Sequence, residues 1–277
     1  MSKQNTNTPV PVEETTTALA TLQQNNFDLI PLSGEIGEII AEEMDGLGTI
    51  PFDLIKIPSG GGLAFELPGE TDDNPTSAPS ITGIIVDHHP INAHWETEFD
   101  GSKNPPDCSS FDGKTALDAT SGELRQCASC PLNQFGSDPK GGNGKACKNM
   151  HRIYILLSGQ PLPMLLILPP TSLAAWRNYL GKKIVARGKR PWMVMTKITL
   201  KREKNANGIA YSQAVFTKVA ELTPAECAAI KPMAETFRAL TRSDAMKSAD
   251  TFTDGTAEAA PGETFTEVTG DEPLPFD

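Results

Sequence analysis

The clearest β-structure in the chain is the stretch WMVMTKITLKREKNANGIAYSQAVFTKV, residues 192–219. Its two halves, 192–200 and 210–219, are rich in β-branched and aromatic residues, which favour strands. The polar connection between them contains Asn207-Gly208, a dipeptide typical of tight hairpin turns. We therefore expect a two-stranded antiparallel hairpin.

Four shorter runs of apolar and β-branched residues precede the hairpin. They predict strands at 81–86, 94–99, 153–157 and 164–168. A turn at Pro90 is expected to separate the first two strands, and Pro169-Pro170 should end the last one.

Two helices are predicted beside these strands. Thr171 caps the first helix, Trp176 lies on its apolar face, and Gly181 ends it. The helical spacing favours the core for Trp176. The second helix begins at the capping box TPAE, residues 223–226, and Pro232 is expected to kink or divide it.

The flanks of the chain differ in composition from this body. Residues 1–26 hold few large apolar side chains, and the residues beyond Ser243 are mostly Asp, Glu, Thr, Gly and Ala, so neither flank buries enough surface to offset the entropy of ordering. The predicted organisation is a disordered arm at 1–26, an acidic segment at 27–80 (helix 34–45, strand 51–57, linker 58–80), a folded domain at 81–243 and a disordered tail at 244–277.

Charge is distributed very unevenly along the 277 residues. The net charge is −11, from 24 Lys and Arg against 35 Asp and Glu, but both flanks are acidic and residues 81–243 have an excess of cations. Between residues 140 and 204 the only acid is Glu203, and solubility alone does not require such a density of cations. No apolar run reaches the roughly 18 to 20 residues of a membrane-spanning helix, and no signal-peptide pattern is present, so a cytoplasmic protein is expected.

Four of the five cysteines, Cys108, Cys127, Cys130 and Cys147, follow the pattern C-x18-C-x2-C-x16-C. A C-x2-C pair with two distant thiols is typical of tetrahedral Zn²⁺, and a cytoplasmic chain disfavours the alternative of disulfides. Because four thiolates close the site, we expect one structural zinc in an insertion at residues 104–150. His151 could replace Cys108 as the fourth ligand.

Catalytic patterns are weak. His88, His89 and His94 could form a second metal site or supply a general base, but no matching carboxylates accompany them, and an ordinary position at a strand end and turn is favoured. The segment 141–145 resembles a phosphate-binding loop but lacks the following Ser or Thr. The protein is therefore expected not to be an enzyme.

Cations and aromatic residues alternate around the predicted hairpin, which is the composition of a groove for single-stranded nucleic acid. The alternative is a solvated basic surface with the aromatic rings in the core. The residues expected to contact nucleic acid are Arg152, Lys182, Lys183, Arg187, Lys189, Arg190, Trp192, Lys197, Lys201, Arg202, Tyr211 and Lys218.

The chain ends in GDEPLPFD, residues 270–277, an isolated Pro-Phe after acids that is typical of a docking peptide. The predicted partner-binding residues are Asp271, Glu272, Pro273, Leu274, Pro275 and Phe276. This tail resembles the tip of bacterial single-stranded DNA-binding proteins, which recruits replication and repair enzymes. One departure is that Asp277 follows Phe276, whereas the bacterial tip finishes on Phe.

The layout of a zinc loop, a small β-barrel and an acidic tail also resembles the zinc-containing phage helix-destabilising proteins. The expected fold is mainly β with flanking helices, an OB-like small antiparallel barrel with a zinc-binding insertion and disordered termini. The expected function is non-enzymatic binding of single-stranded DNA during replication or recombination of a phage or mobile element. Two alternatives remain open: a zinc-stabilised interaction or regulatory protein that binds RNA or a polymerase, and a nuclease accessory or hydrolase that uses the three histidines.

Overall fold

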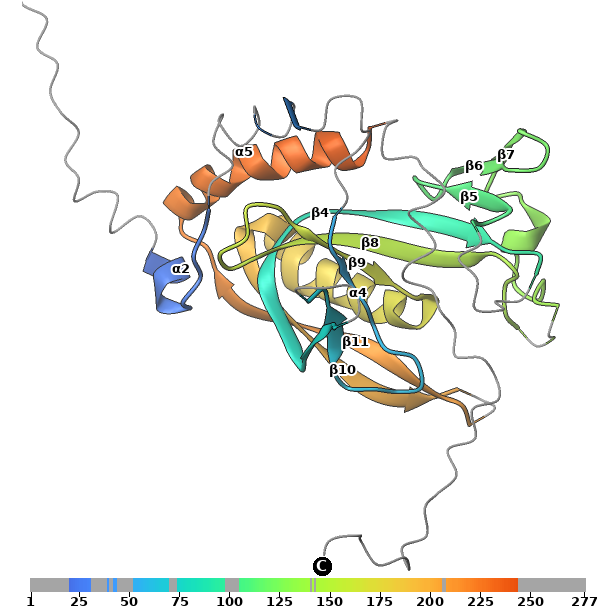
Figure 1. The fold of residues 1–277 in the computed structure, drawn as a ribbon, viewed down its shortest axis with the longest axis horizontal. Coiled ribbons are helices and arrows are strands. Elements are labelled where there is room, and N and C mark those ends of the chain that lie inside the picture. Colours follow the sequence, from blue (N-terminus) through green and yellow to red (C-terminus); the bar gives the residue numbers. More distant parts are fainter. Residues whose placement is uncertain are drawn as a thin grey trace, which may run out of the picture.

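The computed structural model describes residues 20–30, 39, 42–43, 52–69, 74–97, 105–139, 141, 143–205 and 208–243. The predicted tail, residues 1–19 of the predicted arm and most of the predicted helix 34–45 lie outside these residues. The described chain is mainly β, with one large mixed sheet, three α-helices and several short 3-10 turns (Figure 1). None of the described helices is long and apolar enough to cross a membrane.

The sheet is organised around β4 (Ser80–His94), a strand of 15 residues. One edge of β4 pairs with β8 (Lys148–Leu157) over most of its length. The other edge pairs with β10 (Val194–Lys204) near its start and with β5 (Cys108–Ser110) near its end. This strand therefore joins the basic hairpin to the cysteine-bearing segment.

The prediction of a turn at Pro90 and of a separate strand at 94–99 is wrong, because one strand passes through Pro90. Pairing of β4 with β10 ends at Gly83 and pairing with β5 begins at Asn92, so at Pro90 only the edge toward β8 is paired among the described strands. A proline is tolerated where one strand edge needs no backbone donor.

The remaining strands extend the sheet in order β1-β9-β8-β4-β5-β6-β7, with β10 and β11 branching from β4. Their bounds are β1 (Leu54–Ile55), β6 (Thr115–Asp118), β7 (Leu124–Gln126), β9 (Met164–Leu168) and β11 (Ala210–Glu221). The strands predicted at 153–157 and 164–168 are confirmed as β8 and β9. Pairing among the described strands does not close a barrel, since β11 pairs only with β10.

The predicted hairpin is confirmed as β10–β11. Its register places Ile198 opposite Phe216, with a bulge between Met195 and Thr196. Period-2 alternation then buries Ile198 and leaves its neighbour Lys197 exposed.

Residues 58–80, predicted to be a linker, instead contain a small hairpin. It consists of β2 (Phe65–Leu67) and β3 (Thr76–Ala78), and Phe65 is fully buried. The glycine at position 61 has φ +84°, and a Cβ there would lie 2.7 Å from Cγ of Arg202. The Gly-rich run therefore lets the chain pass closely under the basic hairpin.

Two apolar clusters cover the two faces of the sheet. On one face lies α4 (Leu173–Tyr179), and Trp176 is buried against Phe216, as predicted. The predicted end at Gly181 is wrong, because helical turns continue through η3 (Leu180–Ile184) and η4 (Val185–Arg187).

The opposite face is covered by α5 (Pro224–Thr241), whose Phe237 is 1% exposed. Pro232 does not divide this helix. Pro232 and Ala228 are both exposed, so water can solvate the Ala228 carbonyl that loses its intrahelical donor.

Residues 20–26, predicted to be part of the disordered arm, hold α2 (Ala20–Gln24) and a turn that packs on this face. Leu22 is 1% exposed, and its backbone N–H donates to Oε1 of Glu226 at 2.8 Å. A single well-placed leucine and a backbone contact therefore order a polar segment that composition alone assigned to the arm.

Candidate metal pocket and nucleic-acid interface

The described residues between 105 and 147, here called the cysteine module, fold without a large apolar core. Turns in the module are held by side chains instead: Oδ1 of Asp112 accepts hydrogen bonds from the backbone N–H of Lys114 at 2.7 Å and of Thr115 at 2.8 Å. Nδ2 of Asn133 donates to the carbonyl of Cys127 at 2.8 Å. Such local bonds stabilise turns but leave the module with few buried contacts of its own.

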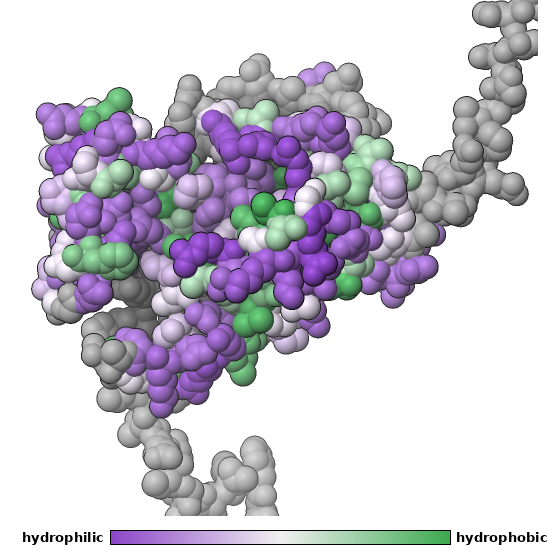
Figure 2. Space-filling model, turned by 180° about the vertical axis from the view of Figure 1, so that it is seen from behind, coloured by the Kyte–Doolittle hydropathy of each residue, from purple (hydrophilic) through white to green (hydrophobic). Residues whose placement is uncertain are grey.

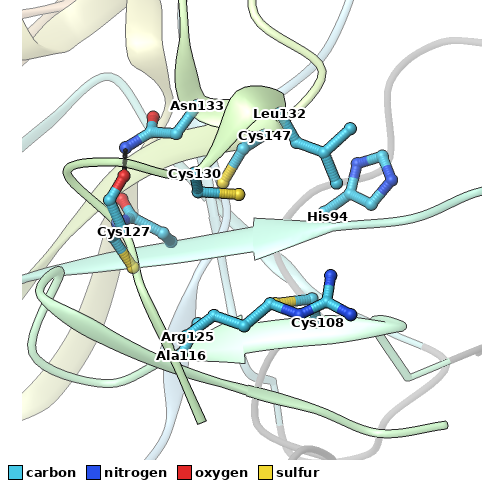
Figure 3. Close-up of a pocket in the computed structure, with 10 residues that line it drawn as sticks. His94, Cys108, Ala116, Arg125, Cys127, Cys130, Leu132, Asn133 and Cys147 are labelled. Carbon is cyan, nitrogen blue, oxygen red and sulfur yellow. Dashed lines mark hydrogen bonds between the residues drawn. The ribbon is translucent and has the colours of Figure 1, made fainter. Parts of the chain in front are cut away.

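All four predicted cysteine ligands line one small cavity of about 20 Å³ (Figure 3). Cys108 begins β5 and Cys127 follows β7. Cys130 precedes the 3-10 turn η1 (Pro131–Asn133), and Cys147 precedes β8. The sheet and the turns thus gather thiols that are up to 39 positions apart in the sequence.

The electrostatics of this pocket disfavour thiolates unless a cation is present. Burial, followed by the neighbouring thiols, raises the pKa of Cys147 to about 12. Burial and then Cys130 raise the pKa of Cys108. A bound cation reverses this effect, because metal-coordinating thiols are deprotonated.

The donor set therefore fits zinc by its chemistry, because four cysteines, whose sulfur atoms are soft ligands, line one cavity. No three His, Cys, Asp or Glu side chains of the described residues already stand in a metal-binding arrangement. The thiol side chains would have to turn inward to coordinate one ion.

His151, considered in the sequence as a replacement for Cys108, does not line the cavity. Its Nε2 lies 2.9 Å from Nδ1 of His88 instead. His94 does line the cavity, and its Nδ1 lies 3.2 Å from the carbonyl oxygen of Ala146. Since a carbonyl only accepts, Nδ1 is the donor in this contact, and Nε2 is the nitrogen that could ligate a metal in the corresponding tautomer.

The three histidines of β4 do not converge on one site. His88 packs against Trp176 with ring centroids 5.1 Å apart, whereas the ring of His89 stacks on Tyr154 on the other face of the sheet. His94 faces the cysteine cavity. Their placement offers no shared general-base site among the described residues.

Arg152 is a correction to the predicted nucleic-acid contacts, because its side chain is fully buried in β8. Its guanidinium lies 5.4 Å from the ring centroid of Phe111. The Arg152 side chain is buried on the face of the sheet that α5 covers, so it cannot reach a phosphate on the surface of the folded chain.

The cations of the hairpin fall on two faces. Lys197 and Lys201 are exposed, and Glu203 points to the same face of β10 because alternate residues of a strand share a face. Glu203 stands opposite Tyr211 of β11, so Tyr211 lies on this outer face too. Arg202 points to the other face, where it lies against Gly61. The outer face therefore presents Lys197, a half-buried aromatic ring, and Lys201, whose ammonium donates to Oε1 of Glu203 at 2.6 Å.

A second group of cations follows α4. Lys182, Lys183 and Arg187 are exposed on η3 and η4, and within the described chain no ion pair is seen for them. Arg190 is also exposed. These four side chains leave their charge available to a polyanion.

Lys189 and Lys218 are less available, since both donate to the carboxylate of Glu221. The hydrogen bonds from Lys189 and then Lys218 lower the pKa of Glu221 to about 2. Trp192, on the 3-10 turn η5 (Pro191–Met193), is half-buried and packs on the core beneath α5. Its ring is therefore partly occupied by the protein itself.

The predicted docking residues of the tail, Asp271 to Phe276, lie outside the described residues. Phe135, which is 74% exposed on the cysteine module, is not among the contact residues that the sequence predicts. No periodicity marks an isolated phenylalanine in a loop, so only its exposure distinguishes it. Seen from behind, the described surface is mostly hydrophilic, with apolar side chains in small separate patches (Figure 2).

Comparison with models of known protein families, with curated proteins and with solved structures found no match.

Proposed function

We propose that this protein binds single-stranded DNA without catalysing a reaction, and that a structural zinc ion holds its cysteine module. The observation that carries the proposal is the presence of exposed cations on two elements, the hairpin β10–β11 and the turns that follow α4. Cations track phosphates and nearby aromatic rings accept bases, which is how single-strand grooves are built.

The strand order supports an OB-like interpretation of the sheet. β4, β8 and β9 pair consecutively, and β10 returns to pair with β4 before β11 follows. OB-folds are partly open five-stranded barrels that bind oligonucleotides with the face of strands 2 and 3 and with the loops between strands 1 and 2 and strands 4 and 5. In this order those loops correspond to the cysteine module and to the turn of the β10–β11 hairpin.

The N-terminal elements occupy the gap that such a barrel leaves open. β1 pairs in parallel with β9, and the hydroxyl of Ser212 on β11 donates to the carbonyl of Gly62 at 2.8 Å. The β1–β2 connection therefore lies between the two strands that would otherwise complete the barrel, which accounts for an OB-like order in an open sheet.

The zinc proposal rests on the thiols that share one cavity, Cys108, Cys127, Cys130 and Cys147. Zinc bound there would tie the start of β5, the C-x2-C turn and the start of β8 together, replacing the apolar core that the module lacks. The acidic tail, Asp271 to Phe276, is proposed on sequence alone to recruit replication or recombination proteins.

The function is tested by the salt dependence of binding. Fluorescence anisotropy would compare a labelled single-stranded DNA, the same sequence as duplex, and single-stranded RNA between 50 and about 300 mM salt. If roughly four to six phosphates are neutralised, log K against log salt should have a slope near −3 to −4. Equal affinity for duplex, or a flat salt dependence, would overturn the proposal, and a strong preference for RNA would favour the RNA-binding alternative.

Matched variants locate the interface. Replacing both Lys197 and Lys201 by Ala should lower the slope by about 0.7 to 1.4, because each lost phosphate contact removes about 0.7 on single strands and Lys201 is already paired with Glu203. Lys231→Ala is the control, since this exposed lysine on α5 pairs with Glu235 at 3.8 Å, away from the hairpin. An equal effect of the control would show that net charge alone, and not the hairpin face, governs binding.

A further inference from the structure

The cysteine module presents an aromatic ring and a cation together. Phe135 is 74% exposed, and Nζ of Lys145 lies 4.8 Å from the centroid of its ring. A cation over an aromatic face is an electrostatically favourable pair. This pair comes from the two ends of the loop between Cys130 and Cys147.

The cation is held in place by amide oxygens rather than left to swing in water. Nζ of Lys145 donates to Oδ1 of Asn133 at 3.2 Å and to Oδ1 of Asn149 at 3.0 Å. Nδ2 of Asn149 in turn donates to Oδ1 of Asn92, a β4 residue, at 2.7 Å. The position of Lys145 is therefore set by the central strands of the sheet.

The loop that bears the ring is cross-braced. The N–H of Gly136, directly after Phe135, donates to the carbonyl of Gly144 at 2.7 Å. The N–H of Cys147 donates to the carbonyl of Leu132 at 2.9 Å. An exposed phenylalanine on a braced loop is preorganised to meet a flat partner, because little conformational entropy remains to be lost.

We infer that Phe135, with Lys145 behind it, forms a base-stacking contact for single-stranded DNA on the cysteine module, in addition to the hairpin contacts. This inference rests on the proposed function. Lys145 lies over the ring, and the exposure of Phe135 leaves ring surface open to a base. Base stacking on aromatic side chains tolerates any sequence, since every base has a π-face.

The position of the module suits a second contact on one strand. The cysteine module and the turn of the β10–β11 hairpin extend toward the same end of the long axis of the molecule (Figure 1). A short oligonucleotide bound on the hairpin need not extend as far as Phe135, whereas a longer one can contact both the hairpin and Phe135. The effect of Phe135 should therefore depend on oligonucleotide length.

Stacking and phosphate contact leave different signatures in the salt dependence of binding. The side chain of Phe135 carries no charge, so removing it removes no cation that could neutralise a phosphate. Loss of the ring should consequently weaken binding with little change in the salt slope, unlike loss of Lys197 and Lys201.

The test uses the full chain, with oligothymidylates of about 6 and about 20 nucleotides, one near the lower end of usual OB site sizes and one beyond their upper end. Phe135→Ala should weaken binding of the longer oligonucleotide about tenfold and leave binding of the shorter one unchanged. Leu124→Ala is the matched control, because Leu124 is also 74% exposed on the same module, and it should bind like the wild type. Phe135→Trp should retain binding and show fluorescence quenching on addition of the longer oligonucleotide.

The outcomes separate this inference from the proposed function. Failure of the wild type to bind single strands would overturn both. Wild-type binding with an unchanged Phe135→Ala variant would overturn only the stacking contact, as would an equal loss in Leu124→Ala. The Phe135→Ala variant must have the circular dichroism spectrum and the metal content of the wild type. A loss of affinity is then caused by loss of the ring and not by unfolding of the cysteine module.

Discussion

Zinc uptake by the cysteine module should release about four protons per ion at pH 7. Free thiols titrate near 8.5, so at pH 7 only about 3% of an ordinary cysteine is thiolate. Burial raises the pKa of Cys108, and that of Cys147 to about 12, which lowers the thiolate fraction of these two further. Because zinc binds thiolate, each ligand must lose its proton on coordination.

The consequence is a steep dependence of zinc affinity on pH. Each proton released contributes one power of ten per pH unit, so four protons predict an affinity about 10⁴-fold weaker at pH 6 than at pH 7. Isothermal titration calorimetry of the reduced, metal-free protein in two buffers of different ionisation enthalpy counts the protons directly. Competition with a chromophoric chelator at several pH values supplies the affinity.

The proton count also discriminates between ligand sets. A count near three would place a histidine, for which His94 is positioned, in place of one thiol, since a neutral imidazole releases no thiol proton. Cys147→Ser should lose tight binding, whereas Cys227→Ser, a cysteine on α5 outside the cavity, should behave like the wild type. No tight uptake by fully reduced protein, or release of one proton or fewer, would refute the four-thiolate reasoning.

Three further predictions concern stability and recruitment. Glu226→Ala removes the acceptor of two backbone N–H groups and should lower the free energy of unfolding in urea by about 2–4 kcal/mol, whereas exposed Glu235→Ala should change it by less than about 0.5 kcal/mol. Burial lowers the pKa of His88 to about 4 and of His151 to about 3, so at acidic pH the unfolded state binds more protons than the folded state. The contribution of these two histidines is constant above pH 7, and stability should fall between about pH 6.5 and 4, by up to about 2–3 kcal/mol per pH unit in urea titrations; a flat profile would contradict this. Phe276→Ala should abolish capture of replication proteins in pull-downs and leave DNA affinity unchanged, and unaltered capture would mark the tail as a solubility device.

Local sequence patterns determined the elements that depend on neighbouring residues. Runs of β-branched and aromatic residues joined by Asn207-Gly208 located the hairpin β10–β11, and helical spacing placed Trp176 in the core. The capping box at residues 223–226 is present with both of its hydrogen bonds, including Thr223 Oγ1 accepting from Glu226 N at 3.2 Å. These features follow from backbone geometry within a few residues, which is why they can be inferred without the fold.

Tertiary structure decided which chemically similar residues meet. Arg152 resembles the other cations in the sequence, yet the pairing of β8 with β4 and β9 places it beneath α5. His94 faces the cysteine cavity, whereas His151, nearer to Cys147 in sequence, pairs with His88. In each case strand register selects the face of the sheet, and a shift of one residue would exchange the two faces. Register is set by partners tens of residues away, so composition and spacing identified the cations and thiols, and only long-range pairing determined which of them share a site.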